Sequence, residues 1–487
     1  MGVTVGRNWI ALWRCAAGLA AALMAAPAAG LPGGAASAAE AQRVSPSQRG
    51  VELRSLDDLS VPALRSRTYS SQLAYEAPLA DTCYTLPAGR PAPGVTYMAS
   101  YRSDGLREYA RIDVPVAPPP PRGYPVVVFA HGWVGKAGAP TYSFGCAATT
   151  GYPVYADLIQ AYVEAGFVVV TPGYRGHGTI RGRPADGLAF LDVWDNATYI
   201  SPQFYAVDIL NLLSALTSPG ASDALAAPRP APIDPRRIHL KAHSQGGDAA
   251  LTVAAVVDRD RAARLHLASV SIWAGTFMDR LVQLRTYAPM QEAPEAYLAG
   301  DGTWTGGAVG ADGRVNPDFV FGYPDPGTDL KARPAGHGAT VEGVTRDRLT
   351  QMYATLNRYV ADLSGLSFTV QKLEKGGFAV IHDRRVVDAY RRLGGYGFVR
   401  EISVPVALHV SDHDYNSLPS WNEAACRQMT EAGGRCTAHV YPGNTHELGL
   451  SKALWFSPPG SAAGFQDMVR SDLEQFSEAA AAVEGRR

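Results

Sequence analysis

The sequence predicts an α/β fold with a doubly wound, mostly parallel sheet. Two continuous runs of β-branched and aromatic residues, Tyr124 to Ala130 and Phe167 to Val170, have the composition of strands that are buried on both faces. Segments with helical spacing of apolar residues alternate with these runs, for example Ser201 to Leu216. Alternating strands and helices are typical of a parallel sheet covered by helices on both sides.

The chain divides into five predicted segments. We expect a signal peptide over residues 1–41, an N-terminal extension over 42–93, the first part of the core over 94–275, a large, mostly helical insertion over 276–397, and the second part of the core over 398–487. The extension shows no clear period. The insertion is assigned because Leu349, Met352, Tyr353, Leu356, Val360 and Leu363 repeat at helical spacing.

The first forty residues have the pattern of a secretory signal. Arg7 and Arg14 precede an alanine-rich apolar run, which Pro27 interrupts, and small residues such as Ala36-Ser37-Ala38 follow. A membrane anchor is the alternative, but the run is shorter than the roughly 20 apolar residues that a spanning helix needs. We therefore expect a secreted or periplasmic protein with no stable membrane anchor after cleavage.

Charge and cysteine content restrict the class of protein further. The formal net charge is −1 and no Lys/Arg-rich run occurs, so the sequence does not indicate a nucleic-acid partner. Outside the signal segment four cysteines remain, an even number that suggests disulfides in an exported chain. Cys426 and Cys436 are close in sequence and are expected to pair, which leaves Cys83 for Cys146 by elimination.

The other core elements follow from local patterns. A hairpin is expected over Gly94 to Val116, because Ser103-Asp104-Gly105 is a turn signal between two strand-like runs. The remaining predicted strands are Ala268 to Trp273, Val404 to Val410 and Thr437 to Tyr441, and the remaining predicted helices are Tyr155 to Ala165, Asp248 to Val257, Trp421 to Met429 and Ala462 to Ala482.

The stretch from Ile238 to Ala250 carries the strongest functional signal. A short apolar run ends at Ala242, small residues flank Ser244, and a helix is predicted to follow. A serine in a strained turn between strand and helix brings the residues two before and two after it close together, so both must be as small as Ala242 and Gly246. We interpret this as a nucleophile elbow. The alternative is an ordinary strand-to-helix turn with a capping serine.

A serine nucleophile needs a histidine and an acid from later strand ends. His446 lies in the loop after the last predicted strand and is the expected general base. The preceding strand is followed by Asp412 and Asp414. Asp414 is preferred because it is the fourth residue after Val410, which gives the chain room to change direction after the strand, whereas Asp412 lies almost at the strand end. The other aspartate would then be a solvated turn residue.

The oxyanion that forms during acyl transfer needs two N–H donors. Gln245 supplies one because it follows the nucleophile. His131-Gly132-Trp133, at the end of an earlier strand, is expected to supply the other through the Trp133 N–H, with Gly132 giving the chain room to approach.

These residues resemble those of α/β-hydrolase-fold serine hydrolases. The resemblance is carried by His131-Gly132-Trp133, Tyr174 to Gly178, Ala242 to Gly247, Asp414 and His446, and covers roughly Tyr97 to Gly275 and Val404 to Ala482. It implies an eight-stranded sheet, acyl-enzyme chemistry without a cofactor, and a variable lid between the sixth and seventh strands, where residues 276–397 fall. Two residues depart from the usual pattern: Ala242 replaces a glycine, and Gly173 stands where an aspartate is common.

The sequence thus predicts a secreted serine carboxylesterase or lipase-type enzyme that acts on a small-molecule or polymeric ester. One alternative is a serine peptidase similar to the prolyl-oligopeptidase group, which shares the Tyr441-Pro442-Gly443 pattern before the histidine. A second, from another class, is a binding module on an inactive hydrolase fold. A metal site at Asp412, His413 and Asp414 is not expected, because a turn of this composition is usually solvated.

Overall fold

The computed structural model describes residues 51–134, 142–146, 151–194, 198–224, 231–257, 265–283, 341–374, 378–412, 414, 417–442, 446–448 and 462–484. The predicted signal peptide over residues 1–41 lies outside these ranges, as does much of the predicted insertion. Among the described helices, none is both long enough and apolar enough to cross a membrane.

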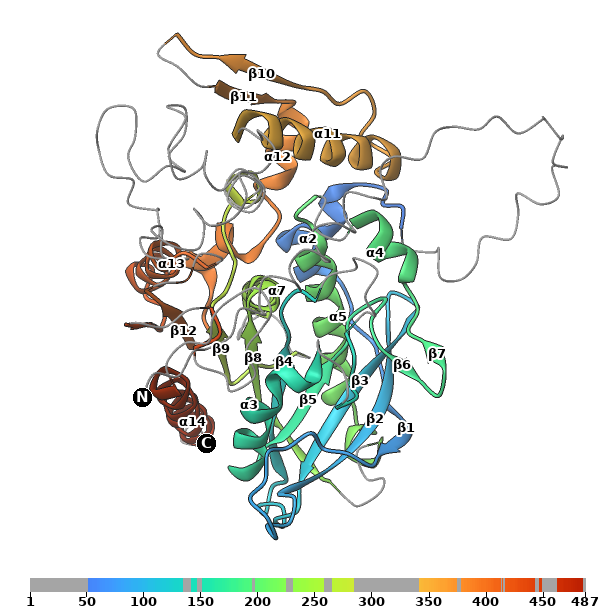
Figure 1. The fold of residues 1–487 in the computed structure, drawn as a ribbon, viewed down its shortest axis with the longest axis vertical. Helices are drawn as coiled ribbons and strands as arrows, with labels where there is room; N and C mark the ends of the chain where they lie inside the picture. The colour runs from blue at the N-terminus through green and yellow to red at the C-terminus, as the bar shows by residue number, and fades with distance from the viewer. Residues whose placement is uncertain are drawn as a thin grey trace, which may run out of the picture.

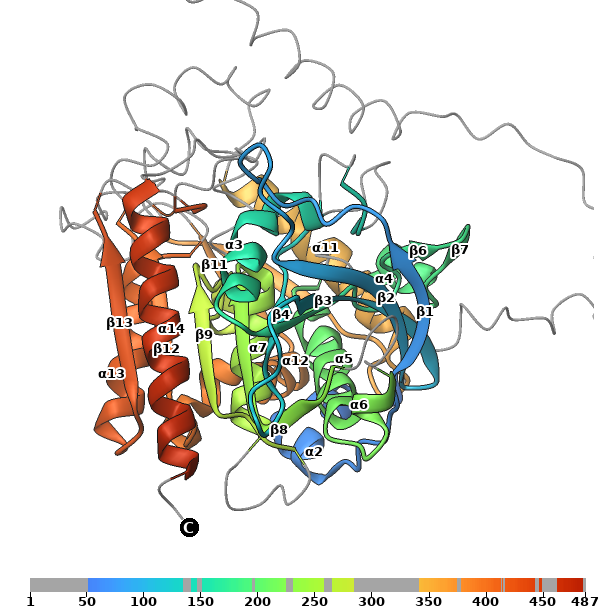
Figure 2. The same ribbon diagram turned by 90° about the horizontal axis from the view of Figure 1, so that it is seen from below.

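A nine-stranded sheet forms the centre of the molecule, with the order β1-β2-β3-β5-β4-β8-β9-β12-β13 (Figures 1 and 2). Along this order, the pairs from β1 to β5 are antiparallel, and the pairs from β5 to β13 are parallel. The strands span Ala74–Leu79 (β1), Gly94–Ser103 (β2), Leu106–Pro115 (β3), Tyr124–Ala130 (β4), Val168–Pro172 (β5), Ile233–His243 (β8), Ser269–Trp273 (β9), Val406–Ser411 (β12) and Cys436–Tyr441 (β13).

The expected α/β class with a mostly parallel sheet is therefore confirmed, but the implied number of eight strands is wrong. The additional strand is β1, which comes from the predicted N-terminal extension and pairs with β2 at the edge of the sheet. The same extension also forms a 3-10 helix, η2 (Leu56–Leu59), and a short helix, α2 (Val61–Ser66). The predicted hairpin is present as β2 and β3, and its turn residues Asp104 and Gly105 both have positive φ.

Helices cover both faces of the sheet. Those that pack against it or against one another are α3 (Tyr152–Glu164), α5 (Ser201–Leu216), α7 (Gln245–Val256), α13 (Pro419–Glu431) and α14 (Ala462–Glu484). Figure 2 shows α3 and α14 on one face, whereas α5 and α7 pack together on the other. Strand β4 explains how both faces are buried: Val126 and Val128 join the core on the α5 and α7 side, and Val127 and Phe129 join the core on the α3 and α14 side.

The strand order reverses at β4, which lies between β5 and β8. The chain therefore passes from β4 to β5 in one direction and from β5 to β8 in the other. In open α/β sheets, ligands bind outside the carboxyl ends of the strands at such a reversal. The register places Ala130 beside Ala242 and His243 beside Trp273 at that edge.

The elements of the predicted insertion at the top of Figure 1 are α11 (Val341–Tyr359), α12 (Arg384–Tyr390) and a hairpin of β10 (Phe368–Lys372) and β11 (Phe378–His382). The 3-10 helix η3 (Gly395–Glu401) begins within the insertion, runs past its predicted end and packs against α7 and α13. The hairpin was not among the elements expected from the sequence. Smaller elements elsewhere are α4 (Leu188–Trp194), α6 (Ala221–Ala224) and the two-residue strands β6 (Thr179–Ile180) and β7 (Arg183–Pro184).

Both expected disulfides are present. Cys83 is bonded to Cys146 with a Cα–Cα distance of 5.1 Å, and Cys426 is bonded to Cys436 with a Cα–Cα distance of 5.3 Å. The first joins the N-terminal extension to the segment before α3, and the second joins α13 to β13.

Candidate active site

Ser244 occupies the sharp turn between β8 and α7. Its backbone has φ 54° and ψ −122°, a conformation that a residue with a side chain adopts only where the surroundings impose it. Three backbone hydrogen bonds impose it here: the Ser244 N–H donates to Trp273 O at 3.0 Å, and Ser244 O accepts from the N–H groups of Gly247 at 2.9 Å and Thr276 at 3.2 Å. The turn is thus tied to the end of β9, with the Ser244 side chain only partly buried.

The residues two before and two after the serine are in crowded surroundings. A Cβ atom on Gly246 would lie 2.3 Å from Ala130 O and 2.4 Å from His131 O, which is too close for any side chain. Ala242 is fully buried in the core on the α5 and α7 side. A larger residue at position 246 would therefore push α7 away from the end of β4.

His446 and Asp414 lie together after the last two strands of the sheet. The Nδ1 atom of His446 lies 2.9 Å from Asp414 Oδ1 and 2.8 Å from Asp414 Oδ2, and both side chains are buried. Asp414 Oδ1 also accepts the Ser417 N–H at 2.8 Å, which fixes the carboxylate. Asp412, the alternative acid, is partly exposed, and its N–H donates to Tyr441 O at 3.3 Å.

Electrostatics in this pair favour a basic imidazole. Burial lowers the pKa of His446, but the Asp414 carboxylate, through its charge and its hydrogen bond, and the charge of Glu447 together raise that pKa above the ordinary value. A carboxylate on Nδ1 also fixes the tautomer, because the Nδ1–H must donate to it and Nε2 is then an acceptor.

The His446 loop lies against the elbow. The ring of His243, the residue before Ser244, lies 4.8 Å from the ring of His446. The Nε2 atom of His243 also lies 3.4 Å from His446 O. The structure therefore brings together three of the residues that the sequence analysis singled out, Ser244, Asp414 and His446, at one sheet edge.

The turn at the end of β4 also approaches the serine closely. A Cβ atom on Gly132 would lie 3.1 Å from Ser244 Cβ, so a glycine is the residue that fits this approach. The Gly132 N–H donates to the Tyr155 hydroxyl at 3.1 Å, and Trp133 follows with 37% of its surface exposed. Gln245, the first residue of α7, is buried, and its Nε2 donates to Ser201 Oγ at 3.2 Å. The two residues predicted to stabilise an oxyanion thus belong to two turns that meet at Ser244.

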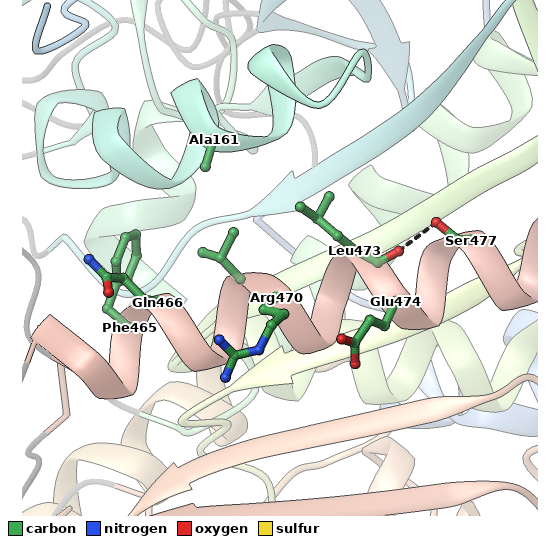
Figure 3. A pocket seen from close by; sticks show the side chains of 8 residues that line it. Ala161, Phe465, Gln466, Arg470, Leu473, Glu474 and Ser477 are labelled. Carbon is green, nitrogen blue, oxygen red and sulfur yellow. Dashed lines mark hydrogen bonds between the residues drawn. The ribbon is translucent and has the colours of Figure 1, made fainter.

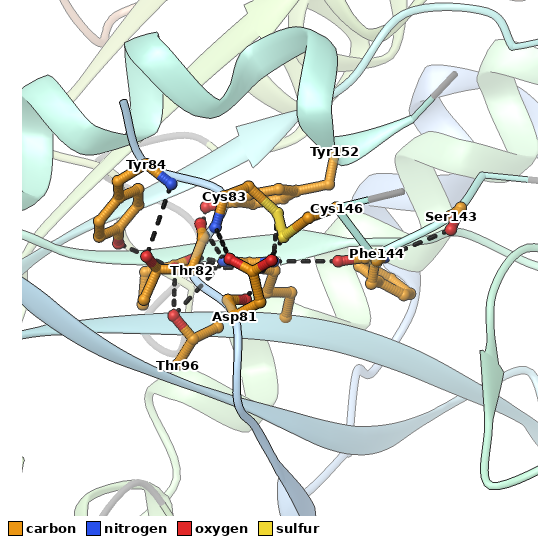
Figure 4. Close-up of a disulfide and its surroundings, with 12 residues drawn as sticks. Asp81, Thr82, Cys83, Tyr84, Thr96, Ser143, Phe144, Cys146 and Tyr152 are labelled. Carbon is orange, nitrogen blue, oxygen red and sulfur yellow. Dashed lines mark hydrogen bonds and ion pairs between the residues drawn. A yellow bond between two sulfur atoms is a disulfide. The ribbon is translucent and has the colours of Figure 1, made fainter. Parts of the chain in front are cut away.

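The segment 142–146 packs against the turn after β4. The ring of Tyr142 stacks on the ring of His131 with a centroid distance of 3.7 Å, and burial lowers the pKa of His131 to about 4, so this ring stays neutral. Figure 4 shows the Cys83–Cys146 disulfide that closes the segment. Beside it, the buried Arg111 guanidinium donates to Thr82 O at 2.7 Å and to Phe144 O at 3.0 Å, which ties both arms of the disulfide to β3.

Two residues near the serine were not given a role in the sequence analysis. The Tyr155 hydroxyl lies 2.8 Å from His243 Nδ1, and both side chains are buried. Tyr155 stands in a helix with no motif around it, so no local signal indicates this contact. His243 was recognised only as a residue of the elbow turn.

One groove and one cluster of possible metal ligands in the described part of the chain lie apart from this site. An apolar groove of about 560 Å³ lies between α3 and α14 and is lined by side chains that include Ala161, Phe465, Val469 and Leu473. Figure 3 shows it from close by. None of its lining residues comes from the loops that carry Ser244, Asp414 or His446. Within the described ranges, Asp81, Cys83 and Cys146 have the spacing of metal ligands, but both sulfurs are in the disulfide. His413, from the metal alternative, lies outside the described residues.

The sheet order, the elbow after a central parallel strand, and the placement of an acid and a histidine after β12 and β13 are those of the α/β-hydrolase fold. No protein-family model matches the chain. No curated protein sequence matches it at a significant level.

Solved structures with a similar arrangement include both esterases and peptidases. An acetyl xylan esterase from Paenibacillus sp. R4 is 15% identical, with a TM-score of 0.45, over 87% of this chain and 96% of that chain. A puromycin-hydrolysing peptidase from Mycobacterium tuberculosis is 13% identical, with a TM-score of 0.45, over 81% of this chain and 41% of that chain. The acylaminoacyl peptidase from Pyrococcus horikoshii is 12% identical, with a TM-score of 0.41, over 79% of this chain and 40% of that chain. The present chain thus matches about two fifths of the length of the two peptidases.

Proposed function

We propose that this protein is an exported serine hydrolase that cleaves carboxylic esters through an acyl-enzyme on Ser244. The observation that carries the proposal is the backbone of Ser244, whose φ of 54° and ψ of −122° hold the residue in the turn between β8 and α7. Such strain at a partly accessible serine is characteristic of functional sites. The buried pair of His446 and Asp414 beside the same turn supports it.

In the proposed reaction, Ser244 Oγ attacks the ester carbonyl carbon while His446 Nε2 takes the hydroxyl proton. The N–H groups of Gln245 and Trp133 stabilise the oxyanion of the tetrahedral intermediate. When that intermediate collapses, the alcohol leaves with the proton from His446. Water then attacks the acyl carbon, with His446 as general base, and the acid is released. Asp414 holds the imidazole in the required tautomer and stabilises its cationic form.

We propose ester cleavage as the reaction, with cleavage of a peptide bond by an enzyme similar to the prolyl-oligopeptidase group as the alternative. Export is proposed from the N-terminal pattern together with the two disulfides, since disulfides persist in oxidising compartments.

Labelling with a fluorophosphonate tests the nucleophile. The wild-type protein should be labelled, and Ser244→Ala should not, whereas Ser218→Ala should be labelled like the wild type. Ser218 is a suitable control because its hydroxyl only caps the end of α5, with Oγ 2.8 Å from Ala215 O. Absence of labelling in the folded wild-type protein would overturn the proposal and favour a binding module.

Substrate class is tested on the same samples with a series of p-nitrophenyl esters of increasing acyl length and a series of aminoacyl-p-nitroanilides. Turnover of the esters, lost in Ser244→Ala, is the expected result. Clear anilide activity with poor ester activity would instead identify a peptidase. The N-terminal sequence of the protein recovered from the periplasm or medium of an expressing cell tests export, and an uncleaved N-terminus would contradict the proposed signal peptide.

A further inference from the structure

The buried hydroxyl of Tyr155 joins two loops that approach Ser244 from different strands. Tyr155 lies in the first turn of α3, and its ring packs edge-on against Phe129 of β4 with a centroid distance of 4.8 Å. The hydroxyl accepts the Gly132 N–H at 3.1 Å and lies 2.8 Å from His243 Nδ1. It therefore connects the turn after β4 to the residue before the proposed nucleophile.

His243 continues this connection to the third loop. Its Nε2 lies 3.4 Å from His446 O, and its ring packs on Trp273 with a centroid distance of 4.0 Å. Steric crowding shows how closely the loops meet: a Cβ atom on Gly132 would lie 3.0 Å from the Tyr155 hydroxyl and 3.1 Å from His243 Nδ1. Three strand-end loops thus converge on two buried side chains.

The direction of each hydrogen bond follows from counting donors and acceptors. The backbone N–H of Gly132 can only donate, so the Tyr155 oxygen accepts there and its own proton is available for His243 Nδ1. An imidazole that accepts at Nδ1 carries its hydrogen at Nε2, which then donates to His446 O. Burial, and then the nearby His446, hold the pKa of His243 well below its ordinary value, so the ring stays neutral and this pattern persists.

We propose that Tyr155 and His243 are positioning residues that act as one unit, holding the turn from His131 to Trp133 and the backbone of His446 in place around Ser244. This inference rests on the proposed function. It has one consequence for the reaction. His446 is held at two points, by Asp414 on its ring and by His243 on its carbonyl oxygen.

The expected size of the effect is substantial, because small displacements of reacting groups cost much of the rate. A misplacement of about 1 Å can lower the rate roughly 10²-fold. Tyr155→Phe keeps the ring against Phe129 but removes the hydroxyl, so we expect the rate of fluorophosphonate labelling and kcat for an ester to fall about 10- to 100-fold. KM should change by less than about threefold, because neither residue is expected to contact the substrate.

The matched control is Tyr162→Phe. Tyr162 is buried on the same helix, and its hydroxyl donates to Asp472 at 2.5 Å, so this variant also loses one buried hydrogen bond of α3. It should be less stable than the wild type but should be labelled within about twofold of the wild-type rate. A rate loss as large as that of Tyr155→Phe would show that any weakening of α3 slows the reaction, and would overturn the positioning role.

A double-mutant cycle tests whether the two residues act together. His243→Phe retains an aromatic ring against Trp273 but has no ring nitrogens, and it should reduce labelling about as much as Tyr155→Phe. The double variant should lose no more than the more impaired single variant, because either change breaks the same connection. If the losses in labelling rate of the two single variants multiply in the double variant, the two residues act independently and the proposal that they act as one unit is refuted.

The outcomes separate this inference from the proposed function. If the folded wild-type protein is not labelled at Ser244, the serine hydrolase proposal fails and the positioning role fails with it. If the wild type is labelled and Tyr155→Phe is labelled at the same rate, the positioning role alone is overturned.

Discussion

Replacement of Asp414 by asparagine is predicted to invert the tautomer of His446. Asp414 Oδ1 accepts the Ser417 N–H at 2.8 Å, so in the variant the amide oxygen must remain on that side to satisfy the same donor. The amide NH₂ group then faces His446 Nδ1, where the carboxylate oxygen lay at 2.8 Å. To accept from it, Nδ1 must lose its hydrogen, and Nε2 then carries a proton and cannot accept one from Ser244.

The expected loss is large although the change in volume is small. When only the tautomer of the catalytic histidine is wrong, kcat falls about 10⁴-fold, which corresponds to about 5.4 kcal/mol of activation free energy. The pH dependence should also move. His446 must be unprotonated to act as base, so kcat/KM rises with pH through its pKa. In the wild type Asp414 helps to raise that pKa above the ordinary value of 6.5. The kcat/KM of Asp414→Asn should therefore begin to rise with pH at a lower pH than that of the wild type.

The assay is kcat and kcat/KM for a p-nitrophenyl ester between about pH 5 and 9, with circular dichroism to show that each variant is folded. Asp412→Asn is the control, because Asp412 is the alternative acid of the same turn, and we expect its activity to stay within about threefold of the wild type. If Asp414→Asn keeps more than about a tenth of the wild-type kcat, or if Asp412→Asn causes the greater loss, the assignment of the acid is wrong.

Two further predictions concern buried charges. Asp472→Asn removes the partner of the buried Lys241, whose Nζ lies 2.7 Å from Asp472 Oδ2, and should lower the free energy of unfolding by about 3–5 kcal/mol in urea titrations at pH 7. Burial raises the pKa of Asp472, but Lys241 and His409 hold that pKa well below the ordinary value. The wild type should therefore lose the stability contributed by the charged pair as the pH falls below about 4. A difference in stability between wild type and Asp472→Asn that does not depend on pH would contradict the prediction. Burial and the neighbouring Asp208 raise the pKa of Glu108 well above its ordinary value. Between the pKa of Glu108 in the unfolded chain and its higher pKa in the folded protein, the folded protein holds a proton that the unfolded chain has released. Stability therefore falls as the pH rises through this interval. Glu108→Gln should therefore be more stable than the wild type at about pH 7, with a difference that shrinks towards about pH 4; equal or lower stability at neutral pH would refute this.

The core strands could be predicted because burial on both faces gives a continuous apolar run in the sequence. Every residue of β4 from Tyr124 to Ala130 is buried, and the run is apolar apart from its tyrosine hydroxyl. The edge strand β1 has no such run. Most of Ala74–Leu79 is exposed or half-buried, and Pro78 lies within it, so neither alternation nor an apolar stretch marks the strand. The hairpin of β10 and β11 was not predicted for the same reason, since its residues are largely exposed or half-buried.

The site could be predicted as far as strand ends determine it. Parallel strands bring their carboxyl ends to one edge, so loops after β8, β12 and β13 had to meet whatever their separation in sequence. The sequence could not indicate which helix side chain would reach between those loops. Tyr155 reaches Gly132 and His243 because of how α3 crosses the sheet, and that crossing depends on packing with distant segments.

Strand β8 shows that an alternating sequence pattern can identify a strand correctly and still mispredict which of its faces is exposed to water. His239, Lys241 and His243 alternate with apolar residues, which by itself would indicate a face open to water. In the structure this polar face is buried, with α14 packed against the strand. It is tolerated there because each of the three side chains has a polar partner from another element, in order Ser269, Asp472 and Tyr155.

That matched row of polar contacts also fixes the position of the proposed nucleophile. A slip of β8 by one residue would turn Lys241 into the apolar core on the α5 and α7 side and would leave Asp472 without its cation. The cost of such a slip is therefore several kcal/mol, whereas a strand with apolar residues on both faces could slide more cheaply. Because Ser244 follows directly after the last residue of this row, the buried charges in the middle of the strand hold the serine in register with the ends of β4 and β9.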